Sequence, residues 1–139
     1  MNLLPFLLHN WALLLIAVVA GTLLMAPGLM SGMRPGGLSA GDAVHLMNRE
    51  RAVVVDVSEN NEFAAGHIVG ARNIPVAQFD QRLPEVVRNK GVPLILVCAT
   101  GARAQRCLAK AKTLGYEKAV VLAGGLRAWK DANLPVERS

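Results

Sequence analysis

Charge is absent from the first part of the sequence. Residues 1–33 contain no Asp, Glu, Lys or Arg, although these four types make up 18% of the 139 residues. All 15 basic and 10 acidic side chains therefore lie in residues 34–139. We accordingly divide the chain into an N-terminal anchor (1–33), a linker (34–37) and one α/β domain (38–139), which is long enough for a single hydrophobic core.

Cysteine and aromatic residues are also scarce. Two cysteines in a chain of this length are typical of reactive or buried thiols and exclude a disulfide framework. We find no His/Cys cluster with metal-ligand spacing and no phosphate-binding glycine–lysine loop, so we expect no metal and no cofactor. The basic residues form no dense stripe with interspersed aromatic residues, which argues against nucleic-acid binding. The net charge of +5 favours small anions or an anionic membrane surface instead.

The uncharged N-terminal stretch is long enough to cross a membrane. Trp11 to Met33 is a run of uncharged residues, and about 20 apolar residues at 1.5 Å each span a ~30 Å hydrocarbon layer. Trp11 suits the interface, and Pro27-Gly28 should end the helix. A cleaved signal peptide fits less well, because residues 1–10 have no Lys or Arg and Met25-Ala26-Pro27 is a poor cleavage site. A buried core helix is the weakest of the three readings.

The positive charges indicate how such an anchor would be oriented. Arg34, Arg49 and Arg51 follow the apolar stretch, whereas no Lys or Arg precedes it. Because basic residues stay on the cytoplasmic side, we expect a single-pass protein whose domain faces the cytoplasm, at the inner membrane if the source is bacterial. The lipid bilayer is then a partner.

In residues 38–139, strand-like and helix-like segments alternate. Runs of β-branched residues predict strands buried on both faces, and such strands alternating with helices predict a mostly parallel sheet covered on both sides. Pro84 is expected to interrupt a weakly helical stretch at 76–89. Strands are predicted at 52–57, 71–74, 94–98 and 119–122, and helices at 40–48, 62–66, 102–114 and after Gly124-Gly125.

The segment Cys98 to Arg103 carries the most informative chemistry. Cys98 is predicted to be the last residue of a buried strand, at the sheet edge where α/β proteins form their sites. The backbone N–H groups that follow can curl around its sulfur, and the next helix points its positive end there, which favours the thiolate. Cys98 is thus a candidate nucleophile, and the residues expected to hold a substrate are Ala99, Thr100, Gly101, Ala102 and Arg103. The alternative is a small apolar residue that ends a strand.

Five short motifs follow one another along this domain: Asp56-Val57 with Glu62-Phe63, Gly66 to Ala71, Asn73-Ile74-Pro75, Cys98 to Arg103 and Gly124 to Trp129. Together, and in this order, they resemble the rhodanese (sulfurtransferase) family over about residues 38–136. The resemblance implies a three-layer α/β domain with a central, mostly parallel sheet of about five strands. It also implies that Cys98 takes a sulfane sulfur from a donor, holds it as a persulfide and passes it to a thiophilic acceptor, which is a small molecule or a protein thiol.

The chain departs from this pattern in its loop and near Asp56. Many rhodaneses have a basic residue directly after the cysteine, but here Ala99 and Thr100 follow. Weak thiosulfate turnover, or a protein-bound persulfide as the natural donor, is therefore expected. The family often has Arg where Ser58 stands, which puts an ion pair to Glu62 in doubt. Related dual-specificity phosphatases place five residues between Cys and Arg, whereas four intervene here, so phosphate chemistry is less favoured.

Other chemically active side chains have structural interpretations. His67 is either a general base or, as its neighbours favour, the partner in a structural hydrogen bond. Asp56 is expected to order backbone donors near the same sheet edge. Cys107 and Trp129 are expected to pack in the core. A hydrolase using Cys98 and His67 would lack a third, orienting residue.

Two hypotheses follow from these features. The first is a membrane-anchored sulfurtransferase that carries sulfur on Cys98. The second is a catalytically weak rhodanese-fold binding or scaffold module tethered at the membrane. An anchor is unnecessary for a diffusible substrate, so either hypothesis allows for a membrane-protein partner.

Overall fold

The computed structural model describes residues 3–29 and 37–139, with side chains described for 3–22 and 37–139. The chain forms two compact units, Met1–Ser31 and Gly32–Ser139. The predicted linker, most of it within 30–36, lies outside the described residues.

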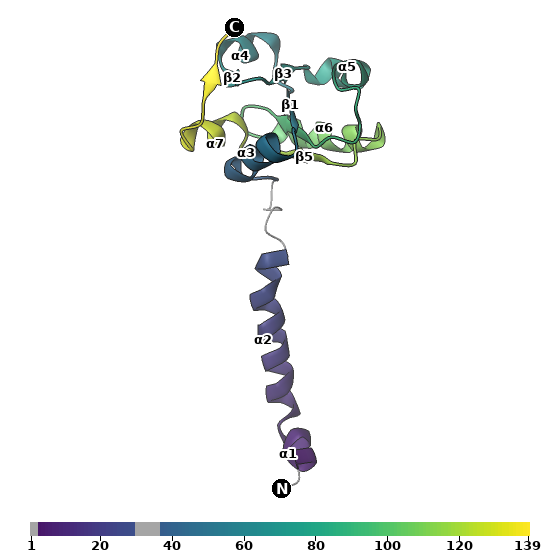
Figure 1. Cartoon of the computed structure of the whole chain (residues 1–139), viewed down its shortest axis with the longest axis vertical. Helices are drawn as coiled ribbons and strands as arrows, with labels where there is room; N and C mark the ends of the chain where they lie inside the picture. The colour runs from purple at the N-terminus through teal and green to yellow at the C-terminus, as the bar shows by residue number, and fades with distance from the viewer. Residues whose placement is uncertain (1–2, 30–36) are drawn as a thin grey trace. The chain divides into compact units, whose positions relative to one another are not determined.

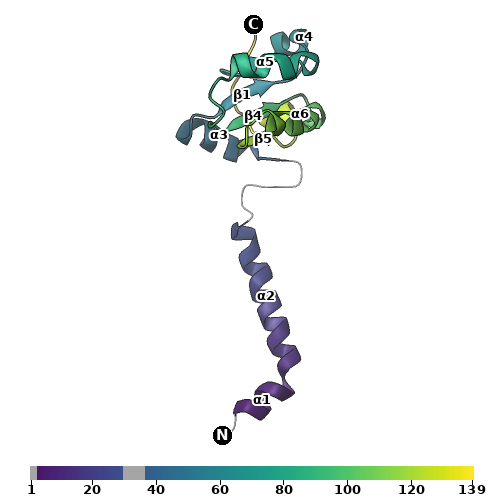
Figure 2. The same ribbon diagram turned by 90° about the vertical axis from the view of Figure 1, so that its right-hand side faces the viewer.

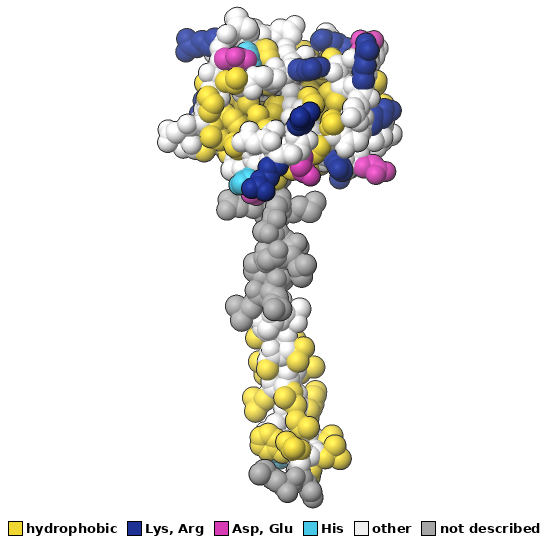
Figure 3. All heavy atoms as spheres, viewed as in Figure 1, with side chains coloured by type: hydrophobic (Ala, Val, Ile, Leu, Met, Phe, Trp, Pro, Cys, Tyr) yellow, Lys and Arg dark blue, Asp and Glu magenta, His cyan; other side chains and the backbone are white. Residues whose placement is uncertain are grey.

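The N-terminal unit consists of two helices, α1 (Leu3–His9) and α2 (Trp11–Leu29) (Figure 1). Asn10 separates them, and its side-chain amide donates a hydrogen bond of 2.9 Å to the carbonyl oxygen of Phe6. The large apolar side chains of residues 3–22 are exposed, and Figure 3 shows those on the face in view. In water, exposed apolar surface of this extent is unfavourable.

The sequence predicts one transmembrane helix, and the structure differs from that prediction. Among the described residues, no single helix is both long and apolar enough to cross a membrane. Leu3–His9 and the part of α2 up to Thr22 reach that length and composition only as a pair, and the pair is bent by 74°. Asn10 is the residue at which the helical axis breaks.

The second unit alternates strands and helices as predicted. Ser39 caps the first helix, since its hydroxyl accepts a hydrogen bond of 3.2 Å from the N–H of Asp42, as the capping pattern predicts. The elements are α3 (Ala40–Arg49), β1 (Val53–Asp56), α4 (Asn60–Ala65), β2 (His67–Ile68), β3 (Arg72–Asn73), a 3₁₀ turn η1 (Val76–Gln78), α5 (Phe79–Val86), β4 (Leu94–Val97), α6 (Ala102–Thr113), β5 (Ala119–Val121), α7 (Gly125–Asp131) and β6 (Val136–Glu137).

The main sheet has four parallel strands in the order β3-β1-β4-β5. Strands β1 and β4 occupy the centre and are nearly fully buried, which explains their continuous apolar sequences. In Figure 2 the strands lie between α3 on one side and α6 on the other. The predicted α/β architecture is therefore confirmed, and the carboxyl ends of β1 and β4 lie side by side, where Asp56 pairs with Val97.

Helices cover both faces of the sheet and create two apolar cores. One core lies under α5 and α6 and includes Phe79, Leu83 and Cys107. The other lies under α3 and α7 and includes Ala43 and Trp129. Tyr116 closes the first core, where its buried hydroxyl donates to the carbonyl oxygen of Val87.

The expected fifth strand of the main sheet is reduced to one bridge in the part of the chain that the structure describes. Leu38 pairs in parallel with Leu122, beyond the end of β5. The pairing stops there because Ser39 already begins the cap of α3. A second sheet, which the sequence did not predict, consists of β2 and β6, which pair antiparallel with two residues each. Strands this short carry no readable alternation.

Pro84 does not interrupt its helix, contrary to the prediction. It lies inside α5, which continues to Val86. A proline here removes only one backbone hydrogen bond near the end of the helix. The buried side chains of Phe79 and Leu83 hold α5 against the core.

Gly125, the first residue of α7, packs directly against the segment that follows β4. Its φ angle is +60°, which side chains disfavour. A Cβ at this position would overlap the carbonyl oxygen of Cys98 and lie 2.8 Å from that of Ala99. Only glycine fits this approach.

We therefore expect Gly125→Ala to lower the free energy of unfolding by at least about 2 kcal/mol. Gly41→Ala is the matched control. Gly41 lies within α3, and a Cβ added there would meet no other atom within 4 Å. This control should be neutral or stabilise by about 0.5–1 kcal/mol. Urea denaturation followed by circular dichroism measures both, and equal stability of the two variants would contradict the packing argument.

Candidate functional site

Cys98 lies just beyond the carboxyl end of β4. The strand ends at Val97, one residue earlier than predicted. Its side chain is 1% exposed and belongs to the core under α5 and α6. The N–H of Gly101 donates a hydrogen bond of 3.0 Å to the Cys98 sulfur. The loop therefore curls around this sulfur and turns at least one backbone donor toward it.

Gly101 makes that turn possible. It has a φ of +103° and is the residue from which α6 begins. The positive end of this 12-residue helix thus lies next to the sulfur. An anion formed at Cys98 would be stabilised by the helix and by the Gly101 N–H together.

Helix α7 holds the loop from the other side. The N–H of Leu126 donates to the carbonyl oxygen of Cys98 at 2.8 Å, and that of Arg127 donates to Ala99 at 3.2 Å. These two bonds come from the first turn of α7 and hold two successive peptide groups of the loop in place. The signal in the sequence was the pair Gly124-Gly125, both of which adopt positive φ.

Arg103, which the sequence predicts to help hold a substrate, reaches across to Glu62. Its two terminal nitrogens each contact one oxygen of the Glu62 carboxylate, both at 2.8 Å. This bidentate pair lowers the pKa of Glu62 and raises that of Arg103. Cys98 makes a smaller contribution to the same shift of the Arg103 pKa. Glu62 therefore has an ion-pair partner after all, although Ser58 replaces the usual arginine.

Ser58 and Asn73 form a polar cluster with Asp56 at the end of β1. The Asp56 carboxylate accepts a hydrogen bond of 2.9 Å from the Ser58 N–H, so it does order a backbone donor. The Asn73 amide bridges the carbonyl oxygens of Asp56 and Ser58 at 3.0 and 2.8 Å. Burial raises the pKa of Asp56, while Ser58, His67 and Arg103 oppose that shift.

His67 is buried and fully hydrogen-bonded. One ring nitrogen lies 2.7 Å from the carbonyl oxygen of Phe63, and the other lies 3.1 Å from the Glu137 carboxylate. The ring also stacks on Phe63 at 3.7 Å between centroids. Strand β6 brings Glu137 to this position by pairing with β2. These contacts fit the structural interpretation of His67.

The remaining predicted residues lie in the core. Cys107 is fully buried, and burial raises the pKa of its thiol. Trp129 is buried and its indole N–H donates to the carbonyl oxygen of Pro135 at 2.9 Å. Both placements confirm the packing prediction. Among the described residues, no group of three or more His, Cys, Asp or Glu side chains could hold a metal ion.

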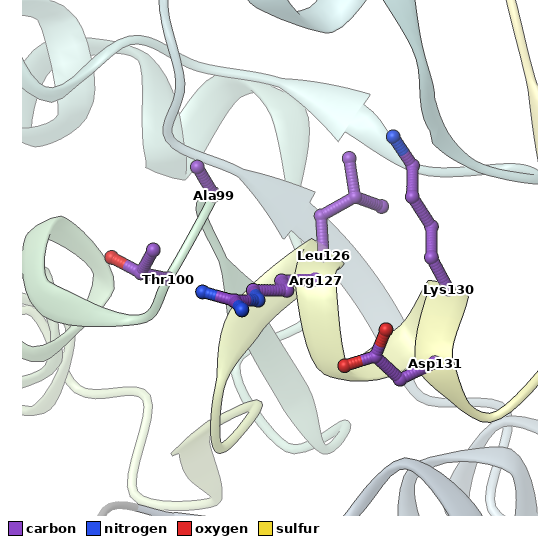
Figure 4. A pocket seen from close by; sticks show the side chains of 6 residues that line it. All are labelled: Ala99, Thr100, Leu126, Arg127, Lys130 and Asp131. Atoms are coloured by element: carbon purple, nitrogen blue, oxygen red, sulfur yellow. The ribbon is translucent and has the colours of Figure 1, made fainter.

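A pocket of about 340 Å³ adjoins the Cys98 loop. Ala99 and Thr100 line it from the loop, and four residues line it from α7: Leu126, Arg127, Lys130 and Asp131. Figure 4 shows the Arg127 side chain extending toward Thr100. Sequence analysis missed this second wall, because Arg127, Lys130 and Asp131 lie far from Cys98 along the chain.

Residues 39–132 match the family model of the rhodanese-like domain. The chain belongs to this family. The matched range includes the Cys98 loop, the Glu62–Arg103 pair and both glycines at the start of α7. The resemblance seen in the sequence is therefore confirmed, since residues 39–132 form a rhodanese-like domain.

Relatives and solved structures agree on this rhodanese-like domain. The uncharacterized protein YibN of Escherichia coli is 31% identical over 135 residues, which cover 96% of this chain and 91% of YibN. Thiosulfate sulfurtransferase GlpE of Pseudomonas putida is 33% identical over 97 residues, which cover 68% of this chain and 84% of GlpE. The human single-domain sulfurtransferase TSTD1 superposes with a TM-score of 0.62 at 29% identity, covering 70% of this chain and 97% of TSTD1.

The Glu62–Arg103 pair generates a prediction about stability. The two side chains are 40% and 29% exposed, so we expect Glu62→Gln to cost about 0.5–1 kcal/mol near neutral pH. Because the folded state lowers the pKa of Glu62, this contribution is fully present above its ordinary value of 4.5. It is lost as the pH falls through the lowered pKa. Urea denaturation at neutral and acidic pH should show the difference between the two proteins shrinking with acidification.

Glu59→Gln provides the control for that measurement. Glu59 lies one turn earlier and has no ion pair in the part of the chain that the structure describes. The substitution should change stability by less than about 0.5 kcal/mol at either pH. A cost for Glu62→Gln that does not depend on pH would contradict the ion-pair explanation.

Proposed function

We propose that this protein is a membrane-anchored sulfurtransferase that carries sulfane sulfur as a persulfide on Cys98. The hydrogen bond from the Gly101 N–H to the Cys98 sulfur supports this most directly, because it stabilises an anionic sulfur at that position. The family also includes relatives named as sulfurtransferases. Sulfane-sulfur chemistry therefore suits both the site and its relatives.

The reaction needs no group beyond the cysteine, the donor and the acceptor. With thiosulfate, the Cys98 thiolate attacks the outer sulfur, a new S–S bond forms, and sulfite leaves with the electron pair of the broken S–S bond. An acceptor thiolate then attacks the outer sulfur of the Cys98 perthiol and becomes a persulfide itself. Cys98 leaves as the thiolate and is ready for another cycle.

We expect the natural sulfur donor to be a persulfide and not thiosulfate. Ala99 and Thr100 bring no charge to the loop, and Arg103 is already bonded to Glu62. A dianion such as thiosulfate thus meets few free cations within the loop itself. A protein-bound or small-molecule persulfide carries less charge and needs fewer of them.

The second proposal is a binding or scaffold module, and the burial of Cys98 favours it. A sulfur in a side chain that is 1% exposed reaches a donor only when the loop opens. If it does not react, the domain would act only as a surface for a membrane-protein partner.

Replacing Cys98 by Ser separates the two proposals. Intact-protein mass spectrometry after incubation with thiosulfate or a hydropersulfide should show a gain of about 32 Da, the mass of one sulfur. Cys98→Ser should abolish this adduct, while Cys107→Ala should keep it, since Cys107 is a core residue. The absence of any adduct on the unaltered protein with every donor would support the scaffold module.

We further propose that the N-terminal unit anchors the protein and that the domain faces the cytoplasm. The exposed apolar side chains of residues 3–22 support the anchor, and the basic residues that follow support the orientation. The alignment with YibN extends over 96% of this chain and so includes residues outside the family domain.

Membrane extraction tests the anchor. The unaltered protein should stay with the membrane in alkaline carbonate, and the double substitution Leu15→Arg, Val18→Arg should release it, at a cost of about 2.5–3.5 kcal/mol per arginine. Leu15→Ile with Val18→Ile is the apolar control and should stay. A C-terminal fluorescent-protein fusion that fluoresces would support the cytoplasmic orientation, and a C-terminal alkaline phosphatase fusion with high activity would contradict it.

A further inference from the structure

The pocket beside the Cys98 loop is fixed in relation to that loop. Its loop wall is formed by Ala99 and Thr100, and its opposite wall comes from α7. The hydrogen bonds from Leu126 and Arg127 to the loop carbonyls join the two walls. A molecule in this pocket is therefore held next to the loop that carries Cys98.

The free charges in this pocket are mostly positive. Arg127 and Lys130 are exposed, and neither forms an ion pair within the residues that the structure describes. Asp131 is the one acid in the lining. In Figure 4 it lies farther from Thr100 than the Arg127 guanidinium does. The end of the pocket nearest the loop is thus cationic.

This positive charge supplies what the loop lacks. No basic residue follows Cys98 directly, and Arg103, the basic residue of the loop, is paired with Glu62. In the pocket beside the loop, an anionic substrate meets two cations of α7, Arg127 and Lys130, that have no ion-pair partner among the described residues. The apolar surface of Ala99 and Leu126 between them suits a short aliphatic chain.

We propose that this pocket binds the anionic end of the sulfur donor or acceptor, and that Arg127, assisted by Lys130, selects for it. The substrate class is a small thiol or persulfide that carries a carboxylate or sulfonate on a short aliphatic chain. This proposal rests on the proposed function and names the substrate class of the same site. A volume of about 340 Å³ fits such a molecule.

The pocket holds the part of the substrate that does not react. The Cys98 side chain is absent from its lining and packs toward the core under α5 and α6. The anionic end would therefore lie outside the loop while the sulfur reaches Cys98. Arg127 acts by charge and is a specificity residue, with no role in the bond changes.

Two alkylating reagents of nearly equal shape test this selection without any sulfur transfer. Iodoacetate is anionic and iodoacetamide is neutral, and with both the Cys98 thiolate forms a C–S bond as iodide leaves. The ratio of their rate constants at Cys98, resolved by peptide mass spectrometry, cancels differences in loop opening and thiolate content. Arg127→Ala should lower this ratio roughly three- to tenfold, and Lys130→Ala should lower it less.

Two further variants serve as controls. Arg127→Lys keeps the charge and should preserve most of the ratio. Arg88→Ala removes the same charge from an exposed position in the segment that leads into the amino end of β4, opposite Cys98, and should leave the ratio unchanged. An unchanged ratio in Arg127→Ala, or an equal fall in Arg88→Ala, would overturn the proposal.

The outcome is separable from that of the sulfur-transfer test. If Cys98 gains sulfur but the ratio does not respond to Arg127, the proposed function stands and the anion pocket fails. If the ratio falls as expected but no sulfur adduct forms, the pocket stands and the carrier function fails.

Discussion

The shape of the Cys98 loop depends on two hydrogen bonds from the first turn of α7 to the carbonyl oxygens of Cys98 and Ala99. These bonds hold both carbonyl groups on amides of α7, while the Gly101 N–H donates to the sulfur. Without them, carbonyl dipoles would be free to approach the sulfur and oppose an anion there. The close contact of Gly125 with the same carbonyls shows how little room the arrangement leaves.

A second set of interactions joins the loop to the rest of the sheet edge. Arg103 links α6 to Glu62 on α4, and the Asp56 cluster links the end of β1 to β3. His67 then connects α4 to the β2–β6 pair. Charged and polar groups from six elements are thus linked to one another beside the carboxyl ends of the central strands, where the Cys98 thiol lies.

The sequence was sufficient for what depends on local pattern and insufficient for what depends on distant pairing. The β-branched runs of β1 and β4 and the cap at Ser39 predicted those elements closely, and the order of motifs predicted the family. The Glu62–Arg103 pair joins residues 41 positions apart, and the sequence around neither residue indicates that the two side chains meet. The β2–β6 sheet and the α7 wall of the pocket arise in the same way, from contacts that exist only after folding. Asn10 was overlooked because one amide in an apolar run hardly changes its hydropathy, although it is the point at which α1 and α2 diverge.

The burial of Cys98 has a mechanical consequence. Protein interiors are packed as densely as organic crystals, so an extra sulfur atom on a side chain with almost no exposed surface needs new volume. The neighbours on the core side cannot easily yield it, and the peptide groups of the loop must shift outward. Those peptide groups are bonded to α7, whose outer surface is exposed. If Cys98 carried an extra sulfur atom, the two forms of the protein would therefore differ in the shape of the surface at α7, and a partner protein that binds this surface could distinguish them.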